Sequence, residues 1–413
     1  MANIAPFQAY RYTAKAGPLH NVITQPYDKI SPEMQQRYLR LSPYNLVRII
    51  LGERFPSDND TNNPYTRAAN HLRDWIAEGI LARDPEPALF AYFQEFTSPE
   101  SGQRLVRKGF IGLGPVEEYS AGIVHRHEQT LSGPKKDRME LLRHTHAHFG
   151  HIFMLYPDPS GDVDRELDQA AQGSPLGRLT DEYGELNTIW KISDPAHIAR
   201  IQHLMAEKKL LIADGHHRYE TALAFRRDNP GLAGADRVMM TFVQMHSPGL
   251  EVLATHRVVF NLPNFDAAEF LRKVSANFDV AEIPNFDALK QLWKTTTGST
   301  VLGAAIGNRL YSIQARESTG QLDITVLHEG LLRDVLGISE EAVREQKNLR
   351  YMRGLDAAVA EVHKGAAQIA FLLKPVSVDD VARISFAGGV MPQKSTDFYP
   401  KLLSGLTIYK LGA

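Results

Sequence analysis

Residues 208–227, KKLLIADGHHRYETALAFRR, decide the fold of this chain. The apolar run Leu210–Ala213 predicts a strand, Asp214-Gly215 predicts a tight turn, and the following residues through Arg227 predict an amphipathic helix. A helix N-terminus offers unpaired backbone N–H groups and about half a positive charge. Because His216-His217-Arg218 adds cationic side chains there, the sequence predicts an anion site, most often one for phosphate.

A purely structural interpretation of this stretch is a buried Asp-Gly turn followed by a solvated helix start. The helix dipole favours acidic side chains in the first turn, so a His-His-Arg run is an unusual way to begin a structural helix. The sequence therefore favours a functional turn.

The composition excludes several classes of protein. The chain has 413 residues, which predicts two or three domains, and its formal net charge of −2 gives no overall electrostatic footprint for nucleic acid. There is no cysteine, so thiol catalysis, disulfides and cysteine-ligated zinc are excluded. No apolar run is long enough for a membrane span, and the start MANIAPFQAYRY does not resemble a signal peptide. We expect a cytoplasmic protein.

Strand-like and helix-like segments alternate throughout, with hairpins beside crossovers, which predicts the α/β (or α+β) class with mixed sheets. Leu262-Pro263 marks the expected boundary between an N-terminal α/β region, 1–261, and a C-terminal α/β domain, 262–413. We expect a buried strand at Asn45–Leu51, a loop at Val124–Arg138 and a helix at Met139–Phe149.

The stretch Val124–Arg138, VHRHEQTLSGPKKDR, is polar and broken by Gly133-Pro134. A loop with His127, Glu128, Lys136 and Arg138 can clamp a polyphosphate while offering a carboxylate for proton transfer or for a magnesium ion. A solvated charged loop is the alternative interpretation.

Lys394-Ser395-Thr396, with Lys401, suggests a second anion contact near the C-terminus. The segment lacks the preceding glycines of a P-loop. On pattern alone, Tyr27 and Asp28 are turn or cap residues.

His144, His148 and His151 would share one face of the expected helix, a spacing that could bind zinc or nickel. Only Glu140 lies nearby as a carboxylate, so a polar face with satisfied histidines is the favoured interpretation.

Several motifs together resemble a known bacterial family. They are Gln25-Pro26-Tyr27-Asp28, Pro43-Tyr44-Asn45, His127-Glu128 with Lys136-Asp137-Arg138, Asp214-Gly215-His216-His217-Arg218-Tyr219, Thr255-His256-Arg257, and Met391-Pro392-Gln393-Lys394-Ser395-Thr396 with Pro400-Lys401 and Ser404-Gly405-Leu406. In this order they resemble the family called domain of unknown function 1015. The histidines at 144–151 are not part of that pattern.

The Asp-Gly-His-His-Arg element is also similar to the strand–turn–helix of ParB-like proteins, sulfiredoxins and ADP-using free-serine kinases. The resemblance implies a nucleotide, ATP or ADP, with Mg²⁺, and nucleotide phosphates held at the helix start. The cysteine of sulfiredoxins is replaced here by His216, and the chain shows no helix-turn-helix or basic face typical of a DNA clamp.

We therefore expect a small-molecule phosphotransferase acting on a hydroxy acid or serine-like alcohol, without nucleic-acid or membrane partners and compatible with a homo-oligomer. The expected catalytic residues are Glu128 as general base, Asp214, which binds Mg²⁺ or orients a histidine, His216 and His217. The nucleotide and phosphate contacts are Gly215, Arg218, Lys136, Arg138 and His127. The substrate contacts are Lys394, Ser395, Thr396, Lys401, Tyr27, Asp28, His256 and Arg257. The alternatives are a ParB-like nucleotide switch without turnover and a metal-dependent hydrolase.

Overall fold

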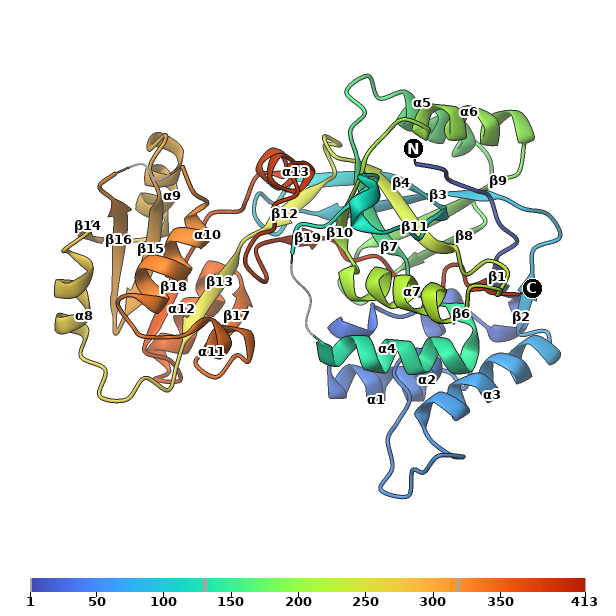
Figure 1. Ribbon diagram of the computed structural model, residues 1–413, viewed down its shortest axis with the longest axis horizontal. Coiled ribbons are helices and arrows are strands. Elements are labelled where there is room, and N and C mark those ends of the chain that lie inside the picture. Colours follow the sequence, from blue (N-terminus) through green and yellow to red (C-terminus); the bar gives the residue numbers. More distant parts are fainter. Residues whose placement is uncertain (1, 129–131, 318–319, 413) are drawn as a thin grey trace. The chain divides into compact units, whose positions relative to one another are not determined.

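The computed structural model describes residues 2–128, 132–317 and 320–412. The chain forms two compact units. Unit 1 comprises Met1–Glu251, Ser385–Gly388 and Phe398–Ala413, and unit 2 comprises Val252–Ile384 and Gly389–Asp397. Both combine sheets with helices (Figure 1), which confirms the predicted α/β class with mixed sheets.

This division differs from the expected one, 1–261 and 262–413, because the chain returns to unit 1 at its C-terminal end. Strand β20 (Tyr409–Lys410) pairs with β6 (Ala147–His148), and Ser404 forms a bridge with Thr24. The strands β12 (Glu251–Leu253) and β19 (Asp397–Tyr399) and the helix α13 (Val378–Phe386) fall where the chain passes between the units.

An eight-stranded sheet in the order β5-β10-β7-β11-β4-β3-β9-β8 organises the described part of unit 1. The pairs β10–β5 and β11–β7 are parallel, and the other neighbours are antiparallel. The strands are β3 (Leu89–Thr97), β4 (Arg104–Pro115), β5 (Val124–His125), β7 (Ile152–Tyr156), β8 (Gly177–Thr180), β9 (Leu186–Ile192), β10 (Leu210–Asp214) and β11 (Arg237–Gln244). A separate pair joins β1 (Tyr10–Tyr12) to β2 (Leu81–Arg83).

The helices of unit 1 pack against this sheet and against each other. They are α1 (Pro32–Leu41), α2 (Val47–Ile50), α3 (Pro64–Ala77), α4 (Ser132–Thr145), α5 (Asp162–Ala170), α6 (Pro195–Met205) and α7 (His216–Asp228). Val163, Ile201 and Tyr219, from α5, α6 and α7, share a buried cluster with Met154 and Ile212 of the sheet. Helix α4 packs on α7 and on α3 (Figure 1), so α7 lies between the sheet and a further layer of helices.

Unit 2 is built on an antiparallel sheet that is six-stranded in the described residues, with the order β14-β16-β15-β18-β13-β17. Its strands are β13 (Thr255–Val259), β14 (Phe278–Ile283), β15 (Val301–Ile306), β16 (Arg309–Ala315), β17 (Leu349–Arg353) and β18 (Ile369–Leu372). Its helices are α8 (Ala267–Val274), α9 (Phe286–Thr295), α10 (Asp323–Val326), a π-helix (Leu327–Arg333), α11 (Glu340–Arg344) and α12 (Leu355–His363). Two separate buried clusters, one with α8 and one with α9 and α12, show that helices cover both faces of the sheet.

Two local predictions are wrong. Asn45–Leu51 contains the short helix α2 instead of a strand, and the Asn45 side chain accepts the N–H of Val47, the first residue of that helix, at 3.0 Å. The expected loop Val124–Arg138 contains β5 and the first half of α4. A proline in the first turn of a helix loses no hydrogen bond, so Pro134 is compatible with α4.

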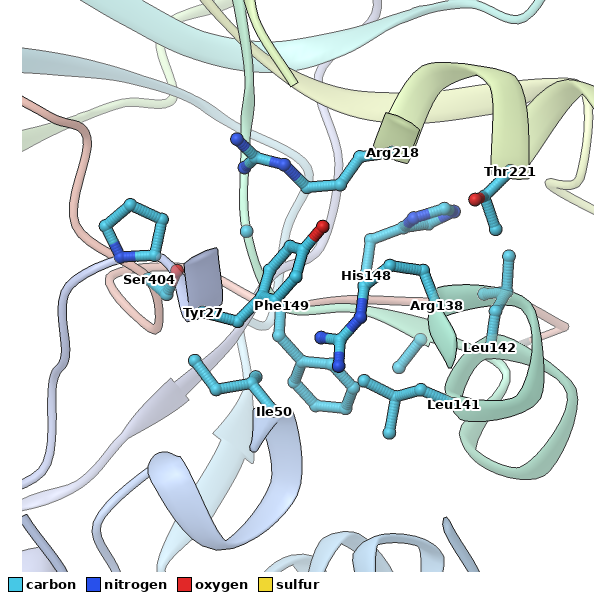
Figure 2. Close-up of a pocket in the computed structure, with 13 residues that line it drawn as sticks. Tyr27, Ile50, Arg138, Leu141, Leu142, His148, Phe149, Arg218, Thr221 and Ser404 are labelled. Carbon is cyan, nitrogen blue, oxygen red and sulfur yellow. The ribbon is translucent and has the colours of Figure 1, made fainter. Parts of the chain in front are cut away.

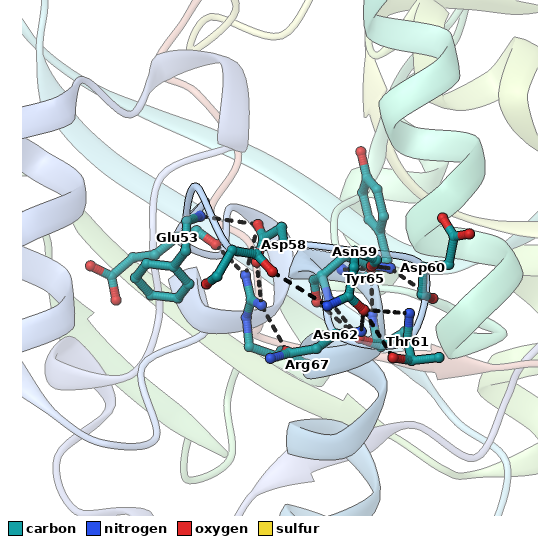
Figure 3. A network of polar contacts seen from close by, with 12 residues as sticks. Glu53, Asp58, Asn59, Asp60, Thr61, Asn62, Tyr65 and Arg67 are labelled. Carbon is teal, nitrogen blue, oxygen red and sulfur yellow. Dashed lines mark hydrogen bonds and ion pairs between the residues drawn. The ribbon is translucent and has the colours of Figure 1, made fainter.

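The acidic loop before α3 is held by its own side chains. The Asn59 side chain accepts the N–H groups of Thr61 and Asn62 at 3.0 Å each, and Arg67 donates to Asp58 at 2.7 Å (Figure 3). Asn63 then caps α3. These contacts give the loop a structural role.

Gly109 in β4 offers a test of how tightly the sheet of unit 1 is packed. A Cβ there would lie 2.7 Å from the carbonyl oxygen of Phe242, whose strand is paired to β4, and 2.8 Å from Val243. We expect Gly109→Ala to lower the free energy of unfolding by about 1–3 kcal/mol, because a paired backbone cannot move away. The control is Gly231→Ala, where nothing lies within 4 Å of the added Cβ. Equal urea midpoints for the two variants would contradict the packing described.

Candidate functional site

The turn between β10 and α7 has the predicted strand–turn–helix structure. Strand β10 ends at Asp214, Gly215 has a φ of 93°, and α7 begins at His216. A positive φ is costly for residues with a side chain, which explains the glycine. Gly215 also provides no side-chain cap for the helix, so the N-terminus of α7 keeps its affinity for an anion.

The carboxylate of Asp214 is shared by two cations. Arg218 Nη2 donates to Asp214 Oδ2 at 2.9 Å, and Lys401 Nζ lies 3.4 Å from Asp214 Oδ1. Arg218 also donates through Nη1 to the carbonyl of His151. The structure thus brings the predicted residues 214, 218 and 401 together, although 401 is distant in the sequence.

A pocket opens beside Arg218 (Figure 2). Its polar lining includes Tyr27, Arg138 and Ser404, and Figure 2 shows Tyr27 between the two arginines. The Arg138 guanidinium carbon lies 3.9 Å from the centre of the Tyr27 ring. Burial raises the pKa of Tyr27, and Arg138 opposes that shift, so the phenol is a neutral hydrogen-bonding group. The apolar lining consists of Pro26, Ile50, Leu141, Leu142, Ala147 and Phe149.

The imidazoles of His127 and His216 form a buried pair behind the turn. Their ring centres are 4.7 Å apart, and His127 Nδ1 lies 2.7 Å from the carbonyl oxygen of Ile212, to which it donates when neutral. The backbone N–H of His127 donates to His216 Nε2 at 3.5 Å. Burial, assisted by His127, lowers the pKa of His216 to about 3, so His216 is neutral. His216 is therefore suited to positioning and not to holding phosphate as a cation.

Glu128 lies at the edge of this histidine pair. Its Oε1 is 3.6 Å from His127 Nε2, and its side chain is 16% exposed. A partly buried carboxylate next to an imidazole that is held in place can act as a general base. His217 lies in the first turn of α7 and is half-buried.

The remaining predicted residues are described by their exposure or by the unit to which they belong. Lys136 and Asp28 are exposed. His256, Arg257, Lys394, Ser395 and Thr396 all belong to unit 2. There, Arg257 Nη2 donates to the carbonyls of Gln393 and Lys394 at 3.1 and 2.9 Å, which joins these two motifs to each other.

The predicted three-histidine face is wrong. Helix α4 ends at Thr145, and His146 has a φ of 48°, which turns the chain out of the helix. Burial lowers the pKa of His148 to about 4 and that of His151 to about 3. His151 contacts the hydroxyls of Thr241 and Thr407 at 2.9 and 3.1 Å. Among residues 2–128, 132–317 and 320–412, no group of three His, Asp or Glu side chains could hold a metal.

Asp214 is also a poor fit to the expected Mg²⁺. Both of its oxygens face cations, Arg218 and Lys401, and a metal would have to displace one of them. Mg²⁺ is usually bound by one or two carboxylates together with substrate phosphates. The geometry favours Asp214 as an anchor for the two cations.

The sequence analysis missed Arg107, a fully buried arginine of β4. Its Nη2 donates to the Pro400 carbonyl at 2.6 Å and to Gln94, whose own amide donates to the Lys401 carbonyl at 3.0 Å. Burial lowers the pKa of Arg107 to about 10. Arg107 and Gln94 thus fix the backbone that carries Lys401. A single arginine in a hairpin strand gives no signal of this, because charged residues are normally exposed.

Comparison with known proteins fixes the family of the chain. The model of the family described as "Protein of unknown function (DUF1015)" matches residues 4–356. The chain belongs to the DUF1015 family. This confirms the resemblance drawn from the motifs. No curated protein matches the sequence.

Solved structures with some similarity to this DUF1015 protein have low TM-scores. A conserved hypothetical protein from Pyrococcus furiosus is 16% identical, with a TM-score of 0.36, and the match covers 67% of this chain and 87% of that one. A free serine kinase in complex with AMP is 15% identical, with a TM-score of 0.38 and coverage of 69% and 89%. SbnI from Staphylococcus aureus, truncated at its C-terminus, is 11% identical, with a TM-score of 0.38 and coverage of 72% and 87%. Likeness at this level does not extend to function.

In the described part of this DUF1015 protein, no helix is both long and apolar enough to cross a membrane.

Glu185 is another buried ionisable residue of unit 1, and the effect of its burial on its pKa can be tested. Burial, followed by Asp181, raises the pKa of Glu185 to about 7. In an unfolded chain the pKa of a glutamate side chain is about 4.3. The free energy of unfolding therefore falls as the pH rises from about 4 to about 7. At pH 8 we expect the free energy of unfolding of Glu185→Gln to exceed that of the natural protein by about 1–3 kcal/mol. We expect this difference to vanish near pH 4.

Urea unfolding across this pH range measures the effect, with the exposed Glu207→Gln as the control. A difference that does not change with pH would contradict the raised pKa.

Proposed function

We propose that this protein is a small-molecule phosphotransferase that moves a phosphoryl group between a nucleotide, ATP or ADP, and a small hydroxy acid or serine-like alcohol. The observation that carries the proposal is that Arg218 and Lys401 share Asp214 at the uncapped N-terminus of α7, while Arg138 lines the same pocket as Arg218. Two guanidinium groups, an ammonium and a helix N-terminus form a favourable environment for phosphate oxygens.

In this proposal Arg218 and Arg138 contact nucleotide phosphates, and their forked N–H groups match two oxygens each. Gly215 allows the phosphate to approach the helix backbone closely, and His217 contacts it from the first turn of α7. Tyr27, which lies between the arginines in the pocket, donates its hydroxyl to the same ligand. The apolar part of the pocket excludes water from these contacts, which strengthens them.

The reaction itself needs a base and charge neutralisation. The substrate hydroxyl oxygen forms a bond to the transferred phosphorus, the bond from that phosphorus to the nucleotide oxygen breaks, and Glu128 accepts the hydroxyl proton. His127, held by the carbonyl of Ile212, lies beside Glu128. Lys401 and Arg218 stabilise the negative charge that develops on the leaving oxygen.

A nucleotide-binding switch without turnover is the second candidate. Arg218 already contacts Asp214 and the His151 carbonyl, and a bound phosphate would replace these partners with its own oxygens. This exchange of partners on binding favours a switch. This candidate predicts nucleotide binding without any product.

We expect Glu128→Gln and His217→Ala each to reduce turnover at least about a hundredfold, because each removes a group that acts in the transition state. Phosphorus NMR of ATP or ADP mixed with a panel of small hydroxy acids, including serine, measures the product. The matched control is Arg227→Ala, on the exposed side of α7 and paired with Glu118.

Turnover that persists in both variants and equals that of the control would overturn the assigned roles. Binding of the nucleotide by the natural protein without product from any acceptor would favour the switch instead.

A further inference from the structure

Unit 2 contains a pocket of its own, at one edge of its sheet. Strands β13 and β15 begin at this edge and β18 ends there, since β18 runs antiparallel to both (Figure 1). Helix α10 and the start of α13 close the sides. The cavity has a volume of about 470 Å³, far larger than the slot of about 60 Å³ beside Arg218. Clefts at strand ends with converging polar groups are typical ligand sites.

The walls of this pocket carry both signs of charge. Lys374, Arg257 and Arg383 contribute positive charge, and Asp323 and Asp380 contribute negative charge. Hydroxyl groups surround them, from Thr255, Ser299, Thr300, Ser377 and Ser395. The apolar residues Leu322, Ile324, Leu373, Pro375 and Val376 complete the lining.

Arg257 is a built part of the wall. It is 1% exposed, and its guanidinium donates to the carbonyls of Thr255, Gln393 and Lys394. Carbonyl oxygens orient a guanidinium without removing its charge, so Arg257 brings a positive charge to this end of the pocket.

Asp323 stands at the start of α10. Its Oδ2 is buried, accepts no hydrogen bond from the described residues, and lies 3.3 Å from Lys374 Nζ. The ion pair with Lys374 leaves this oxygen able to accept a hydrogen bond, which a ligand N–H group can donate.

We propose that this pocket binds a small zwitterion of the amino-acid type. The ligand ammonium donates to Asp323, and the ligand carboxylate faces Arg257 and Lys374. The surrounding hydroxyls hydrogen-bond a short polar side chain. A simple anion would leave Asp323 facing negative charge, and a simple amine would leave the cations without a new partner, so the mixed walls select a ligand with both charges.

All the lining residues of this pocket belong to unit 2, and the proposal does not rest on the proposed phosphoryl transfer. It gives a role to Thr255 and Arg257 of the Thr255-His256-Arg257 motif and to Ser395.

Isothermal titration of the full chain with the twenty common L-amino acids, without nucleotide, tests the proposal. The best binder is then compared with its decarboxylated amine and with the hydroxy acid in which a hydroxyl replaces the amine. We expect each analogue to bind at least about tenfold more weakly, since each loses a charge-assisted hydrogen bond.

The location is tested with Asp323→Asn, which keeps the size of the side chain and removes its charge. We expect it to weaken binding of the amino acid at least about tenfold, while Asp287→Asn, the same change at an exposed position of α9, leaves the affinity unchanged. Circular dichroism confirms that both variants fold.

Three results would overturn the proposal: no amino acid binds, an analogue binds as tightly as the amino acid, or Asp323→Asn binds like the natural protein. Equal binding of the hydroxy acid would reassign the pocket to simple anions.

Discussion

The carboxylate of Asp214 holds two cations, Arg218 and Lys401, that reach it from different parts of the chain. This shared ion pair fixes the arginine of α7 against the end of β10 and draws the C-terminal segment to the same point. Because one carboxylate is shared by two positively charged side chains, these three groups together carry an excess of positive charge. The candidate site in unit 1 includes this cluster and the pocket beside Arg218.

Burial strengthens electrostatic contacts, and it also raises the free-energy cost of a charged group that lacks partners. Arg107 lies beneath the C-terminal segment with its side chain 1% exposed, and it holds the Pro400 carbonyl. A charge taken out of water is costly unless its surroundings provide oriented dipoles. The Pro400 carbonyl and the Gln94 side chain provide them at Nη2, and Gln94 also holds the backbone carbonyl of Lys401. Pre-organisation of this kind is what electrostatic stabilisation of a transition state requires.

The central element could be predicted from the sequence because its signals are local. An apolar run, an Asp-Gly turn and an amphipathic pattern define β10 and α7, and the structure confirms them. The apolar run at Asn45–Leu51 was misread because a short run has no clear period and fits either a strand or a buried helix. The helix α4 was missed at its start because Gly133-Pro134 looks like a break. The return of residues 398–413 to unit 1, and the burial of Arg107, depend on partners far away in the sequence and have no local signal.

Isothermal titration with ADP and with ATP compares the nucleotide affinity of the natural protein with that of Arg218→Ala. If the cations around Asp214 hold phosphate, Arg218→Ala binds at least about tenfold more weakly, while Arg227→Ala on the same helix binds like the natural protein. Equal affinity of all three proteins for both nucleotides, with unchanged melting temperatures, would contradict the account.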